Sequence, residues 1–254
     1  MDQFLSGFDI STISLILALC MLGSWQIGRL MGLRLHAKGY DEPSKFDDAG
    51  MAFVGLLVAF AFGMAIETYN QRRTIAVSHS SAIGDFYFSA AMLKEPTRTE
   101  LQTIIRQYGQ LILDLSKGRR RDIDIEDALA RSEQMRKQMA DLVRQAVDDG
   151  SPIAELLNTE LNALTDNEAL RLAAFRQRVP ANILILLCVS SIIATFLIGR
   201  EQAITSVQEF TGTICFVLLI SIAVYVTLDL NSPNQGLIHI SQESLERLMN
   251  SMSR

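Results

Sequence analysis

Hydrophobic residues are concentrated in four stretches that contain no charged side chain. The stretches are 18 to 21 residues long, and they are Ile10–Gly28, Ala49–Ile66, Val179–Gly199 and Phe210–Leu228. A bilayer core of about 30 Å needs about 20 helical residues at 1.5 Å each, so each stretch is long enough to cross a membrane. The pattern predicts an integral membrane protein with four transmembrane helices.

The four stretches form two pairs, and a long charged segment separates the pairs. Within each pair a polar link joins the two stretches, which predicts two transmembrane hairpins. The separating segment carries equal numbers of acidic and basic residues, and its apolar residues recur every three or four positions, as in Leu101–Leu115. Pro96, Gly118 and Pro152 mark helix ends along it. The sequence therefore predicts an all-α fold with a helical soluble insert between spans two and three.

These features divide the chain into four predicted parts. They are the first transmembrane hairpin (1–69), the soluble helical insert (70–178), the second transmembrane hairpin (179–230) and a C-terminal turn with a short helix (231–254). Pro233 cannot continue a helix, so we expect the chain to turn there. We expect Leu245 and Leu248 on the following helix to dock against the insert.

Composition and motifs argue against an enzyme and against a nucleic-acid partner. Apolar residues make up 49% of the chain and charged residues 20%, and the net charge of −5 gives no reason to expect nucleic-acid binding. The three cysteines all lie inside predicted spans, and the three histidines lie in separate polar segments without metal-ligand spacing. No phosphate-binding loop or nucleophile elbow is present. We therefore predict no catalytic residue, no metal site and no cofactor.

Small residues recur every four positions in the second span. Gly55, Ala59 and Gly63 share one face of the predicted helix. Such a pattern is typical of close helix packing in lipid. The alternative is a face that lines a pore in an oligomer, because small side chains leave room for ions. Gly28 and Gly32 form a similar pair at the end of the first span, which we expect to pack.

Charged residues flank the spans on the side of the insert. Glu67 and Asp229 end the second and fourth spans, and Arg72 and Arg73 follow shortly after Glu67. As structural residues, the two carboxylates would cap a span or pair with Arg72 or Arg73. As functional residues, they would place charge at a pore mouth and favour cations over anions.

The second span and the residues after it carry a resemblance to a known family. The segment Phe60–Gly84, with Tyr69 before an Arg-Arg pair, resembles the bacterial bestrophin-like domain family, and further matches include Arg178–Pro180 and Leu228–Gly236. That family is distantly related to the bestrophin anion channels, which are pentamers. The resemblance implies a subunit whose second helix continues into a cytoplasmic helical domain.

Alignment on Tyr69 with the bestrophins assigns candidate pore-lining residues. It brings Gly55, Ala59 and Gly63 near the narrow part of the pore, and a one-residue shift brings in Phe62. Bestrophins have bulky apolar residues there, so this chain departs from their pattern. The resemblance implies a homo-oligomer, a pentamer as in bestrophins, with the lipid bilayer and permeant ions as its other partners.

Two classes of function follow from these features. The first is an oligomeric ion channel subunit with its pore lined by the second span and its selectivity unassigned. The second is a non-conducting membrane scaffold or signalling protein whose insert binds a soluble partner. A proton-coupled transporter would carry an ionisable residue within a span, and none of the four stretches does.

Basic residues near the span ends number seven on the insert side and five on the other. This distribution favours a multi-pass protein of the bacterial plasma (inner) membrane with a cytoplasmic insert and cytoplasmic termini.

Overall fold

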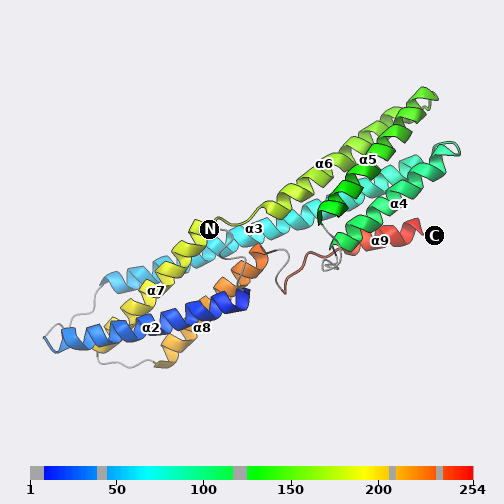
Figure 1. Cartoon of the computed structure of the whole chain (residues 1–254). Helices are drawn as coiled ribbons and strands as arrows, with labels where there is room; N and C mark the ends of the chain where they lie inside the picture. Colours follow the sequence, from blue (N-terminus) through cyan, green and yellow to red (C-terminus); the bar gives the residue numbers. More distant parts are fainter. Residues whose placement is uncertain (1–8, 39–44, 117–124, 206–209, 233–236, 254) are drawn as a thin grey trace. The chain divides into compact units, whose positions relative to one another are not determined.

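The computed structural model describes residues 9–38, 45–116, 125–205, 210–232 and 237–253. Within these ranges the chain forms α-helices and no β-strand (Figure 1). Four helical segments are long and apolar enough to cross a membrane, and they overlap the four charge-free stretches. The prediction of an all-α protein with four membrane spans is therefore confirmed.

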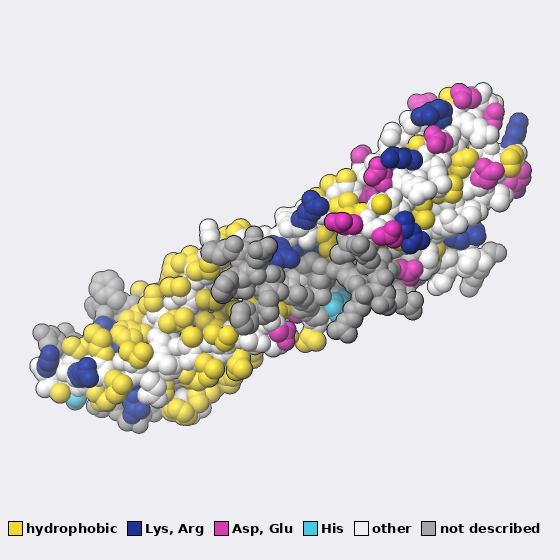
Figure 2. Space-filling model, in the orientation of Figure 1, with side chains coloured by type: hydrophobic (Ala, Val, Ile, Leu, Met, Phe, Trp, Pro, Cys, Tyr) yellow, Lys and Arg dark blue, Asp and Glu magenta, His cyan; other side chains and the backbone are white. Residues whose placement is uncertain are grey.

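The membrane-spanning helices are α2 (Ile10–His36), α3 (Lys45–Ala90), α7 (Ala181–Ile204) and α8 (Phe210–Asn231). Helix α3 is continuous over 46 residues, so it extends well beyond the charge-free stretch. Between Tyr69 and the end of the helix at Ala90, Gly84 is the one glycine or proline, and it is helical. Hydrophobic side chains cover much of the visible surface of the spans, whereas acidic and basic side chains are interspersed on the insert (Figure 2).

Contacts within the chain define two compact units. The membrane unit comprises Met1–Tyr69 with Arg178–His239, and the insert unit comprises Asn70–Gln177 with Ile240–Arg254. The C-terminal segment thus belongs to the same unit as the insert, although more than sixty residues of sequence separate them.

The interior of the membrane unit is filled by side chains from all four spans. They include Met21 of α2, Ala61 of α3, Leu187 of α7 and Ile220 of α8, none of which is more than 2% exposed. A single chain therefore has a packed core between its spans. Such a core leaves the outer faces of the helices to meet lipid or other subunits.

Helices α2 and α7 pack closely through small residues. A Cβ built on Gly32 would lie 2.5 Å from the carbonyl oxygen of Arg200, and one built on Gly199 would lie 2.1 Å from that of Trp25. The Ser24 hydroxyl donates to the carbonyl of Ile192 at 2.8 Å. The contacts advance along both helices in the same direction, so α2 and α7 run parallel. The expectation that the glycine pair at the end of the first span packs is confirmed.

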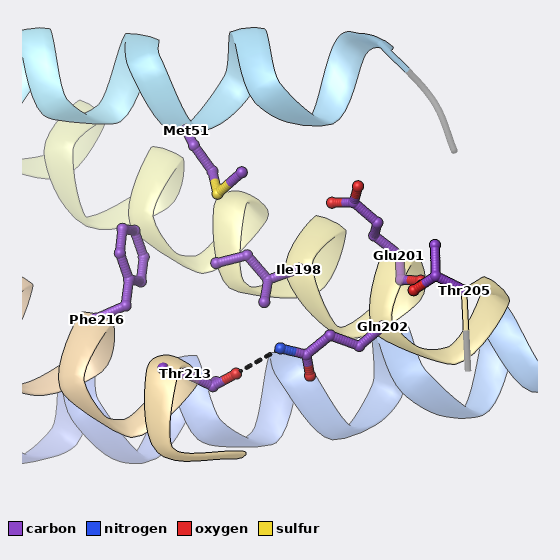
Figure 3. Close-up of a pocket in the computed structure, with 8 residues that line it drawn as sticks. Met51, Ile198, Glu201, Gln202, Thr205, Thr213 and Phe216 are labelled. Carbon is purple, nitrogen blue, oxygen red and sulfur yellow. Dashed lines mark hydrogen bonds between the residues drawn. The ribbon is translucent and has the colours of Figure 1, made fainter. Parts of the chain in front are cut away.

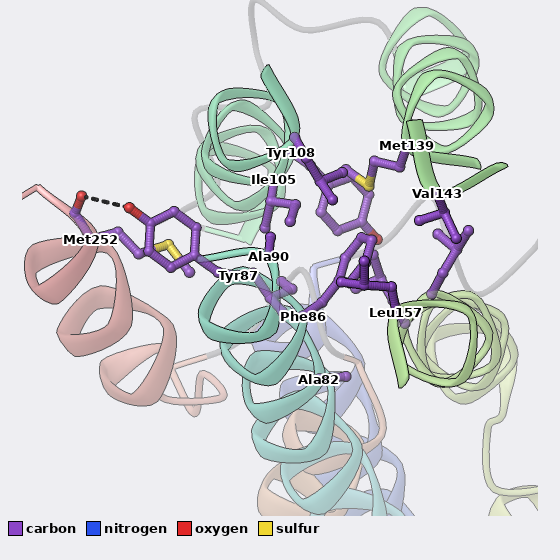
Figure 4. Packing of buried hydrophobic residues seen from close by; sticks show 14 of the residues in the cluster. Ala82, Phe86, Tyr87, Ala90, Ile105, Tyr108, Met139, Val143, Leu157 and Met252 are labelled. Atoms are coloured by element: carbon purple, nitrogen blue, oxygen red, sulfur yellow. Dashed lines mark hydrogen bonds between the residues drawn. The ribbon is translucent and has the colours of Figure 1, made fainter. Parts of the chain in front are cut away.

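The insert consists of the end of α3 together with α4 (Thr97–Ser116), α5 (Ile125–Asp148), α6 (Ala154–Arg176) and α9 (Glu243–Met252). A hydrophobic core joins them, with Phe86, Tyr108, Met139 and Leu157 among its most buried side chains (Figure 4). Helix α9 adds Leu245 and Met252 to this core, and Leu248 packs against it. The short C-terminal helix is therefore present, and it docks through the leucines that the sequence indicates.

Candidate functional site

The row of small residues on α3 lies open in the single chain. No described atom outside the helix's own backbone lies within 4 Å of a Cβ built on Gly55 or Gly63, and Ala59 is exposed. The row on α2 differs, because Gly28 and Gly32 leave no room for a Cβ. Two similar sequence patterns therefore have different environments, and only the row on α2 is used for packing within the chain.

Large apolar side chains lie next to the open row. Phe53, Leu56 and Phe60 are each more than half exposed. Phe62, the alternative pore-lining candidate, is half-buried and packs against a hydrophobic cluster that includes Ala65 and Leu230. Phe62 therefore contributes to the core of its own chain.

Glu67 extends the row of small residues by one helical turn. It follows Gly63 by four positions, on the same face of α3, and it is exposed. Arg73 is also exposed. The pairing of Glu67 with Arg72 or Arg73 stays a prediction.

Arg72 caps the C-terminal end of α6. Its side chain is buried, its Nε donates to the carbonyl of Ala174 at 3.1 Å, and its terminal nitrogen donates to the carbonyl of Gln177. The last carbonyls of a helix accept no N–H from within the helix, and a cation there also interacts favourably with the helix dipole. These contacts fix the end of α6 to α3 within the insert.

Asp229 is only 1% exposed, and its carboxylate holds the chain that follows α8. Its two oxygens accept hydrogen bonds from the backbone N–H groups of Leu237 and Ile238, both at 2.9 Å. Two residues later, the side-chain oxygen of Asn231 accepts from the N–H of Val179 at 2.6 Å. The end of α8 thus binds both the segment that precedes α7 and the segment that leads towards α9. These contacts favour a structural role for Asp229 over an exposed charge at a pore mouth.

A buried polar network connects the helices of the insert. Nε2 of His79 on α3 lies 2.9 Å from the Tyr108 hydroxyl on α4, and the guanidinium of Arg171 on α6 lies 3.4 Å from Nδ1 of His79. Glu168, also on α6, accepts from Ser132 at 2.9 Å and pairs with Arg136 at 2.8 Å. The Tyr108 hydroxyl is also hydrogen-bonded to Glu168. The network therefore links α3, α4, α5 and α6.

The partners of His79 define its tautomer and its charge. The Arg171 guanidinium can only donate, so Nδ1 accepts and Nε2 carries the proton that is donated to Tyr108. Burial and then the positive charge of Arg171 lower the pKa of His79 from 6.5 to about 3. Burial and then the negative charge of Glu168 raise the pKa of Tyr108 above its ordinary value. Both side chains are therefore neutral at physiological pH.

This network could not be predicted from the sequence. His79 stands alone in the sequence, and its partners Tyr108 and Arg171 lie 29 and 92 positions away. Only the packing of the helices brings these side chains together. In the parts of the chain that the structure describes, no group of three or more His, Cys, Asp or Glu side chains has an arrangement that could hold a metal ion.

Comparisons with known proteins support one family. The Bestrophin-like domain matches residues 49–245, which is more than half of the chain. No curated protein matches the sequence.

Solved structures show the same fold. A single-substitution variant of a bacterial bestrophin homologue from Klebsiella pneumoniae is similar with a TM-score of 0.75 and 12% sequence identity, over 97% of this chain and 98% of that chain. Another structure of a Klebsiella pneumoniae bestrophin homologue gives a TM-score of 0.71 and 10% identity, over 94% of this chain and 98% of that chain.

Proposed function

Since the chain belongs to the Bestrophin-like domain family, we propose that it is the subunit of an oligomeric ion channel whose pore is lined by α3. The observation that carries this proposal is the open row of Gly55, Ala59 and Gly63 on a membrane-spanning helix. Small residues at a helix surface in lipid allow close approach of another helix or leave space for a water-filled path. The small residues on α2 already pack against α7. The open face of α3 is therefore the one that is available to contact another helix or to line a water-filled path.

An ion path requires more than one chain. Side chains such as Met21, Leu187 and Val217 fill the space between the four spans of one subunit, and this packed apolar core leaves no room for a hydrated ion. A path would therefore run between subunits, around a symmetry axis lined by α3. We propose a homo-oligomer for this reason, and the family resemblance suggests five copies.

The proposed pore face consists of Gly55, Ala59 and Gly63, with Glu67 at its insert end. We leave Phe62 out because it packs in its own subunit, and Asp229 because its carboxylate is buried against backbone N–H groups. A ring of Glu67 carboxylates, one from each subunit, would attract cations and repel anions. Whether cations or anions dominate the current depends on the whole path.

We propose the bacterial plasma membrane as the location, with the insert and both termini in the cytoplasm. The excess of basic residues near the insert-side ends of the spans supports this orientation. Replacing the exposed Asp149 by Cys tests it in intact cells, because the three native cysteines lie in the spans. The proposal predicts that a membrane-impermeant thiol reagent labels Asp149→Cys only after the cells are broken. Labelling of intact cells would reverse the orientation.

Two measurements on the purified protein test the channel. The mass of the detergent-solubilised particle should correspond to several copies of the 28.2 kDa chain. After reconstitution, liposomes with the protein should release a salt gradient faster than empty liposomes. A monomer would contradict the channel, because one subunit has no room for an ion path. An oligomer without any ion flux would instead favour a non-conducting scaffold.

A further inference from the structure

A pocket of about 400 Å³ lies at the end of the membrane unit where α7 ends and α8 begins (Figure 3). Its apolar wall is formed by Met51 of α3, Ile198 of α7 and Phe216 of α8. The polar wall includes Glu201 and Thr205 at the end of α7. The volume is within the range of small-molecule sites, roughly 300–1,000 Å³.

The position of the pocket along the spans indicates its depth in the membrane. The three apolar residues belong to the charge-free stretches, whereas Glu201 follows just after the stretch that ends at Gly199. The pocket therefore crosses the boundary between the hydrocarbon core and the headgroup layer. A ligand there has an apolar part on the membrane side and a polar part on the water side.

The polar side of the pocket has two electrical poles. The Glu201 carboxylate lies in the last turn of α7, where the helix dipole is also negative. Gly212 and Thr213 lie in the first turn of α8, where the helix dipole is positive and backbone N–H groups have no acceptor within the helix. A negative pole and a positive pole in one pocket are complementary to a zwitterion.

The floor of the pocket is held by a side-chain network. The Gln202 amide donates to the Thr213 hydroxyl at 2.9 Å and accepts from the Trp25 indole N–H at 3.1 Å. These bonds join α2, α7 and α8, so the two poles are held at a fixed separation. A preformed pocket binds a ligand with less loss of conformational entropy than one that must form on binding.

We propose that this pocket binds the headgroup of a zwitterionic phospholipid that carries a primary ammonium group. The ammonium group is bound by Glu201, and the phosphate lies at the first turn of α8. The glycerol and the first methylene groups contact Met51, Ile198 and Phe216. The site is separate from the open face of α3 and does not depend on ion conduction.

Competition between lipids tests the proposal on the intact, detergent-solubilised protein. Phosphatidylethanolamine, phosphatidylcholine and phosphatidylglycerol with identical acyl chains are titrated, and binding is measured by native mass spectrometry. The ethanolamine lipid should bind about three- to fivefold more tightly than the glycerol lipid, which is the magnitude of one partly exposed ion pair. The choline lipid should also bind more weakly than the ethanolamine lipid, because its quaternary ammonium cannot donate a hydrogen bond. Equal binding of the three lipids would overturn the proposal.

Two variants locate the effect. Glu201→Gln keeps the shape of the side chain and removes its charge, so the preference for the ethanolamine lipid should be lost. Asp9→Asn is the matched control, because Asp9 is an exposed carboxylate at the other end of a span and makes no capping hydrogen bond. A preference that survives Glu201→Gln, or that disappears in Asp9→Asn, would contradict the assignment. Competition by water-soluble phosphoethanolamine as strong as that by the lipid would also contradict it, because the apolar wall would then contribute nothing.

Discussion

A Cβ atom on Gly28 would lie 2.0 Å from the backbone carbonyl oxygen of Phe196. Real Cβ atoms do not approach another atom so closely, and a backbone oxygen cannot move aside as the end of a side chain can. The contact between α2 and α7 therefore requires glycine at position 28. On α3, Gly63 has no such neighbour among the residues that the structure describes.

This difference predicts opposite effects for two chemically identical substitutions. Gly28→Ala should force α2 and α7 apart and destabilise the protein by about 1–3 kcal/mol. Gly63→Ala should be neutral or slightly stabilising in the monomer, because alanine is favoured over glycine within a helix. Thermal unfolding of the two variants in detergent measures the effect. Equal melting temperatures for the two would show that the packing of α2 against α7 is not as close as described.

The buried imidazole of His79 predicts a pH-dependent stability. The pKa is about 3 in the folded protein, against 6.5 for the unperturbed side chain, so the unfolded state binds the proton more readily. Stability is then fully present above pH 6.5 and falls as the pH is lowered towards 3. Between pH 6.5 and pH 5 the loss is about 2 kcal/mol, at 1.36 kcal/mol for each unit.

His79→Gln removes the titration and keeps a hydrogen-bond donor for Tyr108. The melting temperature of the wild type should drop on the order of 5 °C from pH 7 to pH 5, and that of His79→Gln should drop less. His239→Gln is the control, because His239 is exposed. If His79→Gln and wild type lose the same stability over this range, another group is responsible for the acid sensitivity.

Asp229 should be required for the attachment of the segment after α8. The carboxylate accepts backbone N–H groups with both oxygens, whereas an asparagine side chain offers one acceptor and one donor. Asp229→Asn therefore places an amide donor against a backbone N–H and should cost about 1–3 kcal/mol. The exposed Asp166 is the control, and Asp166→Asn should leave the melting temperature unchanged. Limited proteolysis near Leu237 should become faster in Asp229→Asn alone; unchanged cleavage would mean that this segment is held by other contacts.

Glu67 provides a test of the charge at the proposed pore mouth. Replacing it by Gln should shift the ratio of cation to anion permeability towards anions. The shift should be largest at low salt, because the field of a surface charge is screened over about 10 Å at 0.1 M. Reversal potentials in asymmetric salt measure it. A reversal potential that does not move would assign Glu67 to a structural pair with Arg72 or Arg73.

The sequence predicted the spans and the helical insert because both depend on local properties. Uninterrupted apolar stretches such as Phe210–Leu228 require helical structure in lipid, since every backbone polar group must be bonded within the segment. The docking of Leu245 could also be predicted from local sequence, because its spacing to Leu248 places both leucines on one face of a helix.

The hydrogen-bond partners of individual polar residues could not be predicted from local sequence. Arg72 was considered as a partner for the nearby Glu67, yet its guanidinium also caps α6, about one hundred residues later. Asp229 was a candidate for a pore mouth, and only the return of Leu237 to the end of α8 gives it two backbone donors. The difference between the rows on α2 and α3 is likewise invisible in the sequence, because it depends on which helix lies opposite.

The central claim is that the open face of α3 lines the ion path, and Ala59→Phe tests it most directly. Ala59 lies in the middle of the row of small residues, so a phenyl ring from each subunit should close the path. Leu19→Phe is the control, since Leu19 lies on α2, is 60% exposed and already carries a large side chain. The ion flux of reconstituted protein is measured together with the mass of the particle. We predict that Ala59→Phe stays assembled and loses its flux while Leu19→Phe retains it. An intact Ala59→Phe oligomer with normal flux, or one that no longer assembles, would contradict a pore at this face.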